Sequence, residues 1–318
     1  MADLLEQLDQ LRATERRVAM ATLMSARGGS PRPIGSKLFV GEGGRLLGSV
    51  SIGGCIDAEL VRMAEGVLEK NESTRVVLDV DDSDAQALGV ACGAQFELLV
   101  DPIAFDGTSP LIPIYEEAVR RSRAGEEAYV VVPRDVTAPR QLSPAPVAAG
   151  GDVAFVDRFA PAETVVIVGA SDTAAALVAM VRALGMRAVV IEGREQFAAR
   201  REFATLGDIQ LGMPSELVRP WLRPTTYLVM LTHDYKFEVP VLREALASDA
   251  RYVGMLAGRK RAAGIRDLLR DAGLTDAQLA RLHSPIGLDL GGREPAEIAV
   301  SILAQIVSVR AGRTADAG

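Results

Sequence analysis

Apolar residues in the first part of the chain recur with the spacings of both helices and strands. Leucines at helical spacing within residues 2–17 predict a helix with one buried face, and residues 111–124 have a similar pattern. Strands are expected over residues 18–25, 38–40, 46–50, 75–80, 95–100 and 128–132. The pattern predicts a mixed α/β domain over residues 1–133.

The composition shifts to Pro, Ala and Gly over residues 134–162, which we interpret as a linker with room for a short strand at 153–156. Residues 163–318 then alternate strands with helices. The β-branched run at 164–168 is typical of a strand buried on both faces, and it opens a βαβ unit. The second domain is therefore predicted to be a Rossmann-like parallel-sheet domain.

Net charge and apolar content exclude several classes of protein. The charge of −7 argues against a general nucleic-acid binder, which needs a basic face. No segment approaches the roughly 18 apolar residues of a membrane span. The N-terminal helix is amphipathic and lacks the apolar core of a secretion signal. We expect a cytoplasmic protein.

A glycine turn precedes the first cysteine. Gly53 and Gly54 allow a sharp turn and close approach of a ligand to the backbone, and Cys55 would lie near a helix N-terminus. That position favours negative charge and lowers the pKa of a thiol. The stretch fits an anion-binding turn with a soft ligand, and a buried structural cysteine fits it equally well.

The second cysteine, Cys92, stands beside Gly93 just before a predicted strand. Alone, it reads best as a buried, inert residue. Thiolates are nevertheless soft ligands for transition metals. Together with Cys55 and the basic loop that carries Arg32 and Lys37, it could hold a metal while the loop binds phosphate.

The turn after the 164–168 strand partly matches the dinucleotide fingerprint G-x-G-x-x-G. Gly169 supplies the first glycine, Ser171 replaces the second, and Ser171 or Asp172 could cap the next helix. Glu192 follows this turn at about the sequence separation expected of an acidic residue that contacts a ribose. Nucleotide or phosphate binding and an inert crevice both remain open.

Two further polar loops follow strands of this domain. His233 precedes Asp234 and could act as a general base or a hydrogen-bond donor, or merely cap a loop. Arg259 begins a run of three cations at a helix start, which suits an anionic group but also a solvated turn.

Several stretches together resemble the xanthine dehydrogenase accessory protein family of the XdhC/CoxI type. They are GGSPRPIGSKL (28–38), GSVSIGGCIDAEL (48–60), LGVACGAQFELLVDP (88–102), VVIVGASDTAAALVAMVRALG (165–185), LTHDYKFEVPVLREAL (231–246), RYVGMLAGRKR (251–261) and LHSPIGLDLGGREPAEIAVSILAQIV (282–307). The resemblance implies an accessory factor rather than an enzyme. Such a chaperone binds the molybdenum–pterin cofactor, protects it during sulfuration and delivers it to a molybdenum hydroxylase of the xanthine or carbon monoxide dehydrogenase type.

The resemblance also implies roles for residues. The family's cysteine-glycine motif, whose cysteine binds the cofactor, matches Cys92 and Gly93, so the resemblance implies that Cys92 binds the cofactor. Cys55 matches a cysteine found in part of the family. Both are the expected metal ligands. The chain departs from many members at Ala94-Gln95 and at Ser171-Asp172. The cytosine dinucleotide form of the cofactor, a cysteine desulfurase partner and a homodimer are options.

Two other functions compete with this one. The βαβ unit, Glu192 and the His233–Asp234 pair suit an NAD(P)-dependent oxidoreductase, although the missing second glycine weighs against it. A nucleotide-binding regulatory module would bind nucleotide without chemistry.

Overall fold

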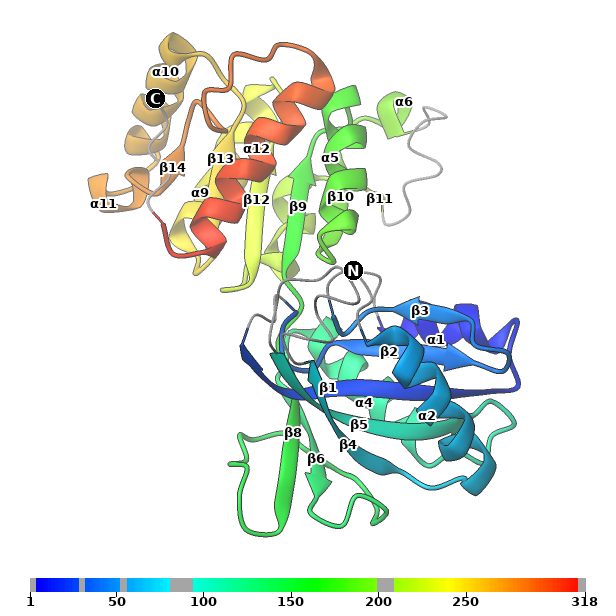
Figure 1. Cartoon of the computed structure of the whole chain (residues 1–318). Helices are drawn as coiled ribbons and strands as arrows, with labels where there is room; N and C mark the ends of the chain where they lie inside the picture. The colour runs from blue at the N-terminus through cyan, green and yellow to red at the C-terminus, as the bar shows by residue number, and fades with distance from the viewer. Residues whose placement is uncertain (1–3, 29–31, 52–55, 81–93, 199–208, 314–318) are drawn as a thin grey trace. The chain divides into compact units, whose positions relative to one another are not determined.

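The computed structural model describes residues 4–28, 32–51, 56–80, 94–198 and 209–313. The chain divides into two compact units, Ala2–Pro161 and Ala162–Gly318 (Figure 1). Each has hydrophobic cores of its own. The sheets are antiparallel in the first unit and parallel in the second. The predicted fold class, a mixed α/β domain followed by a Rossmann-like parallel-sheet domain, is therefore confirmed. Within the described stretches, no helix is long and apolar enough to cross a membrane.

In its described residues, the N-terminal unit contains two antiparallel sheets and three helices. The helices are α1 (Leu4–Arg12), α2 (Asp57–Lys70) and α4 (Leu111–Ala124). The strands are β1 (Arg17–Gly28), β2 (Lys37–Gly41), β3 (Leu46–Gly48), β4 (Thr74–Val80), β5 (Ala94–Ala104), β6 (Ala128–Pro133), β7 (Gln141–Ser143) and β8 (Val153–Phe159). One sheet has the order β3-β2-β1-β5-β4, and the other has the order β7-β6-β8.

Strand β1 shows why helices cover both faces of the larger sheet. Successive side chains of a strand point to opposite faces. Ala19 and Ala21 join the core formed with α2, whereas Val18 and Met20 join the core formed with α1, α4 and β6. Both sets of side chains are almost fully buried.

The structure differs from the linker that we expected over residues 134–162. Strands β7 and β8 lie within that range, and both pair with β6. The N-terminal unit accordingly extends to Pro161. Short strands separated by Pro- and Gly-rich turns have the composition of a linker, but pairing with β6 satisfies their backbone groups.

The C-terminal unit alternates strands and helices. The strands are β9 (Thr164–Val168), β10 (Arg187–Glu192), β11 (Ile209–Leu211), β12 (Thr226–Met230), β13 (Tyr252–Met255) and β14 (Leu282–His283). The helices are α5 (Asp172–Ala183), α6 (Glu195–Ala198), α8 (Pro214–Leu217), the 3-10 helix η1 (Arg219–Trp221), α9 (Tyr235–Ala247), α10 (Arg259–Asp271), α11 (Asp276–Leu279) and α12 (Pro295–Arg310).

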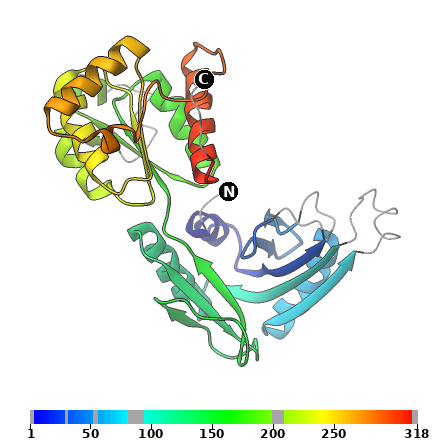
Figure 2. The ribbon, with the colours of Figure 1, turned by 90° about the vertical axis from the view of Figure 1, so that its left-hand side faces the viewer.

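The six strands form one parallel sheet in the order β11-β10-β9-β12-β13-β14. Helices α5 and α12 pack on one face, and α9 and α10 pack on the other (Figure 2). From β9 the chain first adds β10 on one side and later places β12 on the other. The strand order therefore reverses between β9 and β12, and in open α/β sheets ligands bind outside the carboxyl ends of the strands at this switch point.

Candidate functional site

A cavity of about 500 Å³ lies at the carboxyl ends of β9 and β12. Its wall includes Ser171 and Thr173 from the start of α5, and Thr232 and His233 from the loop after β12. The cavity therefore occupies the switch point of the sheet, which Figure 1 allows the reader to locate by the labels β9 and β12.

The turn from β9 to α5 is tightly constrained. Gly169 has a φ of +107°, and a Cβ at this position would lie 2.7 Å from the backbone nitrogen of Thr232. Ser171 is the N-cap of α5, and its hydroxyl accepts a hydrogen bond from Ala174 N at 3.1 Å. Glycine is thus required where β9 and β12 approach each other, and α5 begins at the cavity with its dipole positive toward it.

Thr232 provides a polar group without a partner at the same place. The residue is 4% exposed, and its hydroxyl has no hydrogen-bond partner within the part of the chain that the structure describes. Buried hydroxyls are normally hydrogen-bonded, so this one is suited to meet a ligand or a water molecule. Together with the start of α5, Thr232 makes the cavity suitable for an oxygen-rich anion such as phosphate.

Glu192 lies at the end of β10, where a contact with a nucleotide ribose would be expected. Both oxygens of its carboxylate, however, already accept hydrogen bonds from the chain itself. Oε2 accepts hydrogen bonds from Ala170 N at 2.8 Å and Arg194 Nη2 at 3.1 Å. Oε1 accepts from Arg194 N and Arg194 Nε, both at 2.9 Å. Burial opposes ionisation, but these hydrogen bonds outweigh it and hold the pKa of Glu192 below its ordinary value. Glu192 is 1% exposed, and Arg194 lines the cavity instead.

A second charged network lies beside His233. Arg261 Nη2 donates to Glu238 Oε2 at 2.6 Å, and Arg261 Nη1 lies 3.3 Å from His233 Nδ1. Arg261 also lies over the ring of Tyr235. Because a guanidinium can only donate, Nδ1 is the acceptor, and a neutral His233 ring carries its hydrogen on Nε2. Burial raises the pKa of Glu238, although Arg261 opposes that shift.

The predicted residues of the C-terminal unit are only partly brought together. Ser171 and His233 line one cavity, Asp172 is the first residue of α5, and Gly169 holds the turn. Arg259 is exposed at the start of α10 and does not line the cavity. Sequence reasoning missed Arg194, although its place two residues after the acidic end of a predicted strand was an available signal.

Fewer of the predicted residues of the N-terminal unit can be located. Cys55, Cys92, Gly53, Gly54 and Gly93 lie outside the described residues. Among the residues that are described, no group of three or more His, Cys, Asp or Glu side chains could hold a metal ion.

Two basic residues predicted to bind an anion are described. Lys37 is 7% exposed; its ammonium pairs with Asp157 and donates to Gly35 O at 3.2 Å. This is the geometry of a structural ion pair in the interior. Arg32 is half-buried, and its Nε has no hydrogen-bond partner among the described residues. Of the two, Arg32 is therefore the better candidate for contact with an anion.

Replacing Gly169 by alanine is expected to destabilise the C-terminal unit by about 3 kcal/mol, because the positive φ and the overlap with Thr232 add. The chain has one tryptophan, Trp221, and it lies in this unit. Urea unfolding followed by its fluorescence measures the change. Gly264→Ala is the control, since its Cβ would enter open space within α10. Equal midpoints for the two variants would contradict the packing described here.

Comparison with protein families matches both parts of the chain. Residues 11–81 match the model of the XdhC and CoxI family, and residues 165–306 match the model of the XdhC Rossmann domain. The predicted resemblance is confirmed by these two matches.

Relatives of known name cover most of the chain. The chain is 24% identical over 297 residues to the molybdenum cofactor insertion chaperone PaoD of Escherichia coli, covering 92% of this chain and 83% of PaoD. It is 20% identical to a Bacillus subtilis protein named as a probable subunit of xanthine dehydrogenase, and the similarity covers 95% of this chain and 96% of that protein. A crystal structure described as that of a xanthine dehydrogenase from Bacillus halodurans superposes with a TM-score of 0.79 at 24% identity, over 100% of this chain and 98% of that one. The last similarity concerns the fold alone.

Proposed function

Because the chain belongs to the XdhC and CoxI family, we propose that it is a chaperone that binds the molybdenum–pterin cofactor, protects it and delivers it to a molybdenum hydroxylase. The observation that carries the proposal is the similarity to PaoD, which extends over 92% of the chain. The similarity to a probable component of xanthine dehydrogenase supports a client of the xanthine dehydrogenase type.

The switch-point cavity fits the phosphate-bearing part of such a cofactor. The start of α5 and the hydroxyls of Ser171 and Thr232 would bind and orient a phosphate. His233 would donate from Nε2 when its ring is neutral. A dinucleotide form of the cofactor, such as the cytosine dinucleotide, would place a pyrophosphate there.

The metal end of the cofactor is assigned to the cysteines by the family resemblance. Cys92 and Cys55 would be the thiolate ligands of molybdenum, and the glycines beside them would bare backbone N–H groups to the ligand. When bound, the cofactor brings a metal centre that the client enzyme uses; this chain would hold it and exclude water. A cysteine desulfurase and a second copy of the chain are further partners under this proposal.

Cys92→Ala is expected to lower the molybdenum content of the purified protein by about tenfold or more, since loss of a thiolate ligand should weaken metal binding at least as much as loss of a supporting group. The protein is produced in cells that make the cofactor. Molybdenum is measured by elemental analysis, and pterin is measured by fluorescence after oxidation. Ser143→Ala, which removes a hydroxyl from β7, is the control.

Wild-type protein without molybdenum and pterin would overturn the chaperone proposal. An unchanged molybdenum and pterin content in the Cys92→Ala variant would be compatible with the chaperone function. It would show that Cys92 is not a ligand of the cofactor. Oxidoreductase activity with NAD(P) remains the competing proposal. It is disfavoured because the carboxylate of Glu192, which would bind the ribose, already accepts hydrogen bonds from Ala170 and Arg194.

A further inference from the structure

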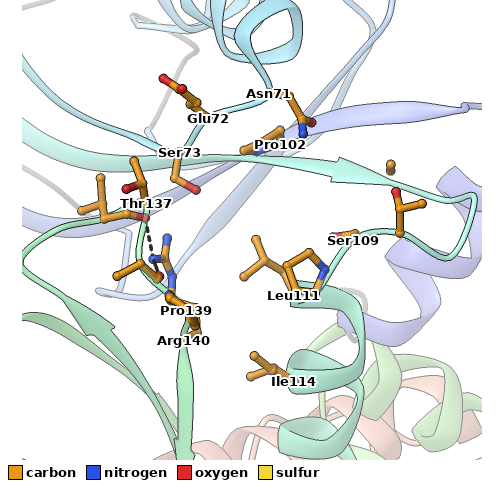
Figure 3. Close-up of a pocket in the computed structure, with 15 residues that line it drawn as sticks. Asn71, Glu72, Ser73, Pro102, Ser109, Leu111, Ile114, Thr137, Pro139 and Arg140 are labelled. Atoms are coloured by element: carbon orange, nitrogen blue, oxygen red, sulfur yellow. Dashed lines mark hydrogen bonds between the residues drawn. The ribbon is translucent and has the colours of Figure 1, made fainter.

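The N-terminal unit contains a cavity of about 340 Å³ that none of the predicted site residues lines. The first turn of α4, with Leu111 and Ile114, forms one side (Figure 3). The loop between β6 and β7 forms another side and ends at Arg140, and Pro102 of β5 adds to the wall. This volume is at the lower end of the range for pockets that hold small organic ligands.

Two buried donors line this cavity. Ser109 is 8% exposed and Arg140 is 6% exposed. Neither the Ser109 hydroxyl nor Arg140 Nε has a hydrogen-bond partner among the residues described by the structure. The threonine hydroxyls of the lining are satisfied, since Thr108 donates to Asp106 and Thr137 donates to Asp135. Buried donors without acceptors are rare in folded proteins, so these two indicate an acceptor that comes from outside the chain.

The start of α4 adds further donors. This helix has 14 residues, and its N-cap, Pro110, makes no side-chain hydrogen bond to it among the described residues. Pro110 and Pro113 have no N–H, so the N–H groups without an acceptor inside the helix are those of Leu111 and Ile112, and the helix dipole places partial positive charge there. Because both unsatisfied side-chain groups in the described lining, Ser109 and Arg140, can donate, the ligand should present oxygen acceptors.

The charges around the cavity limit the ligand to a single negative charge. Arg140 is the only cation among the described residues that line the cavity. Its Nη2 donates to Asp101 Oδ1 at 2.6 Å, so the guanidinium is already neutralised. Glu72 adds an exposed negative charge at the rim. A phosphate dianion would therefore bring two negative charges without a counter-charge, whereas a carboxylate brings only one and can accept from the donors present.

We propose that this cavity binds a small organic monocarboxylate with an apolar body. The carboxylate accepts hydrogen bonds from Ser109 and the start of α4. The carbon skeleton packs against Leu111, Ile114 and Pro102. The site is a second binding function of the N-terminal unit, and it does not depend on the proposed cofactor role.

Titration calorimetry of the full chain with benzoate tests the proposal. Benzamide serves as the neutral isostere, acetate lacks the apolar body, and inorganic phosphate is the dianion. Benzoate is expected to bind saturably, with the other three about tenfold weaker or more. Ser109→Ala is expected to weaken benzoate by about tenfold, because a hydrogen bond to a charged group is lost. Ile114→Trp fills the cavity and is expected to abolish binding.

Ser122→Ala is the matched control, since it removes a hydroxyl from the same helix outside the cavity. Circular dichroism checks that Ile114→Trp folds, and Ala138→Leu fills the cavity from the loop side if it does not. The absence of saturable benzoate binding up to about 10 mM would overturn the proposal. Equal affinity for benzoate and phosphate, or wild-type binding by a folded cavity-filling variant, would also overturn it.

Discussion

Replacing Asp101 by alanine is expected to lower the free energy of unfolding of the N-terminal unit by about 3–5 kcal/mol. The side chains of Asp101 and Arg140 are 0% and 2% exposed, and Arg140 Nη2 contacts Asp101 Oδ1 at 2.6 Å. Removing the carboxylate leaves a guanidinium in the interior without its counter-charge. Burial already raises the pKa of Asp101 against the opposing effect of Arg140, which indicates how strongly this interior penalises charge.

Urea unfolding followed by circular dichroism and by Trp221 fluorescence separates the two units. The Asp101→Ala variant should shift a dichroism transition to lower urea and leave the Trp221 transition in place, because Trp221 belongs to the other unit. Glu127→Ala is the control: its pair with Arg158 is exposed, and its loss should change the free energy of unfolding by at most about 1 kcal/mol. The double variant Asp101→Leu/Arg140→Met should recover part of the loss. Equal effects of Asp101→Ala and Glu127→Ala would refute the argument.

The double variant Ser171→Gly/Arg194→Gly is expected to bind NADH at least about tenfold more tightly than the wild type, whose dissociation constant we expect to exceed about 1 mM. Arg194→Gly removes two side-chain hydrogen bonds from Glu192 and exposes its carboxylate to a ribose diol. Ser171→Gly restores the second glycine of the fingerprint, and glycine at an N-cap costs only a few tenths of a kcal/mol. NADH fluorescence measures the affinity.

Adding Glu192→Ala to this double variant provides the control, because it removes the acceptor that the ribose would use. The gain in affinity should then disappear. Micromolar NADH binding by the wild type would show that the carboxylate is accessible, and it would favour the oxidoreductase alternative. A double variant that folds and shows no gain would mean that Arg194 does not determine nucleotide affinity.

The parallel sheet of the C-terminal unit was predictable because its strands have continuous apolar sequences. Residues 164–168 were predicted as a buried strand that opens a βαβ unit, and β9 occupies Thr164–Val168. A strand buried on both faces leaves little ambiguity in the sequence. The position of His233 at the carboxyl end of β12 followed from the same pattern.

The interior ion pairs were not predictable, because their partners are distant in sequence. Lys37 reads as part of a basic loop, and only the fold brings Asp157 to it. Glu192 reads as a ribose ligand, and only the turn geometry shows that Ala170 and Arg194 hold its carboxylate. Residue type and spacing therefore identified where charge is placed, but they could not say which charges are already neutralised.

The separation of the apolar cores has a consequence for damaged chains. Because Ala2–Pro161 and Ala162–Gly318 each enclose their own cores, a substitution that unfolds one half should leave the other half native. Such a half-native protein would keep the ligand binding of its intact unit. It could not perform a function that requires both units.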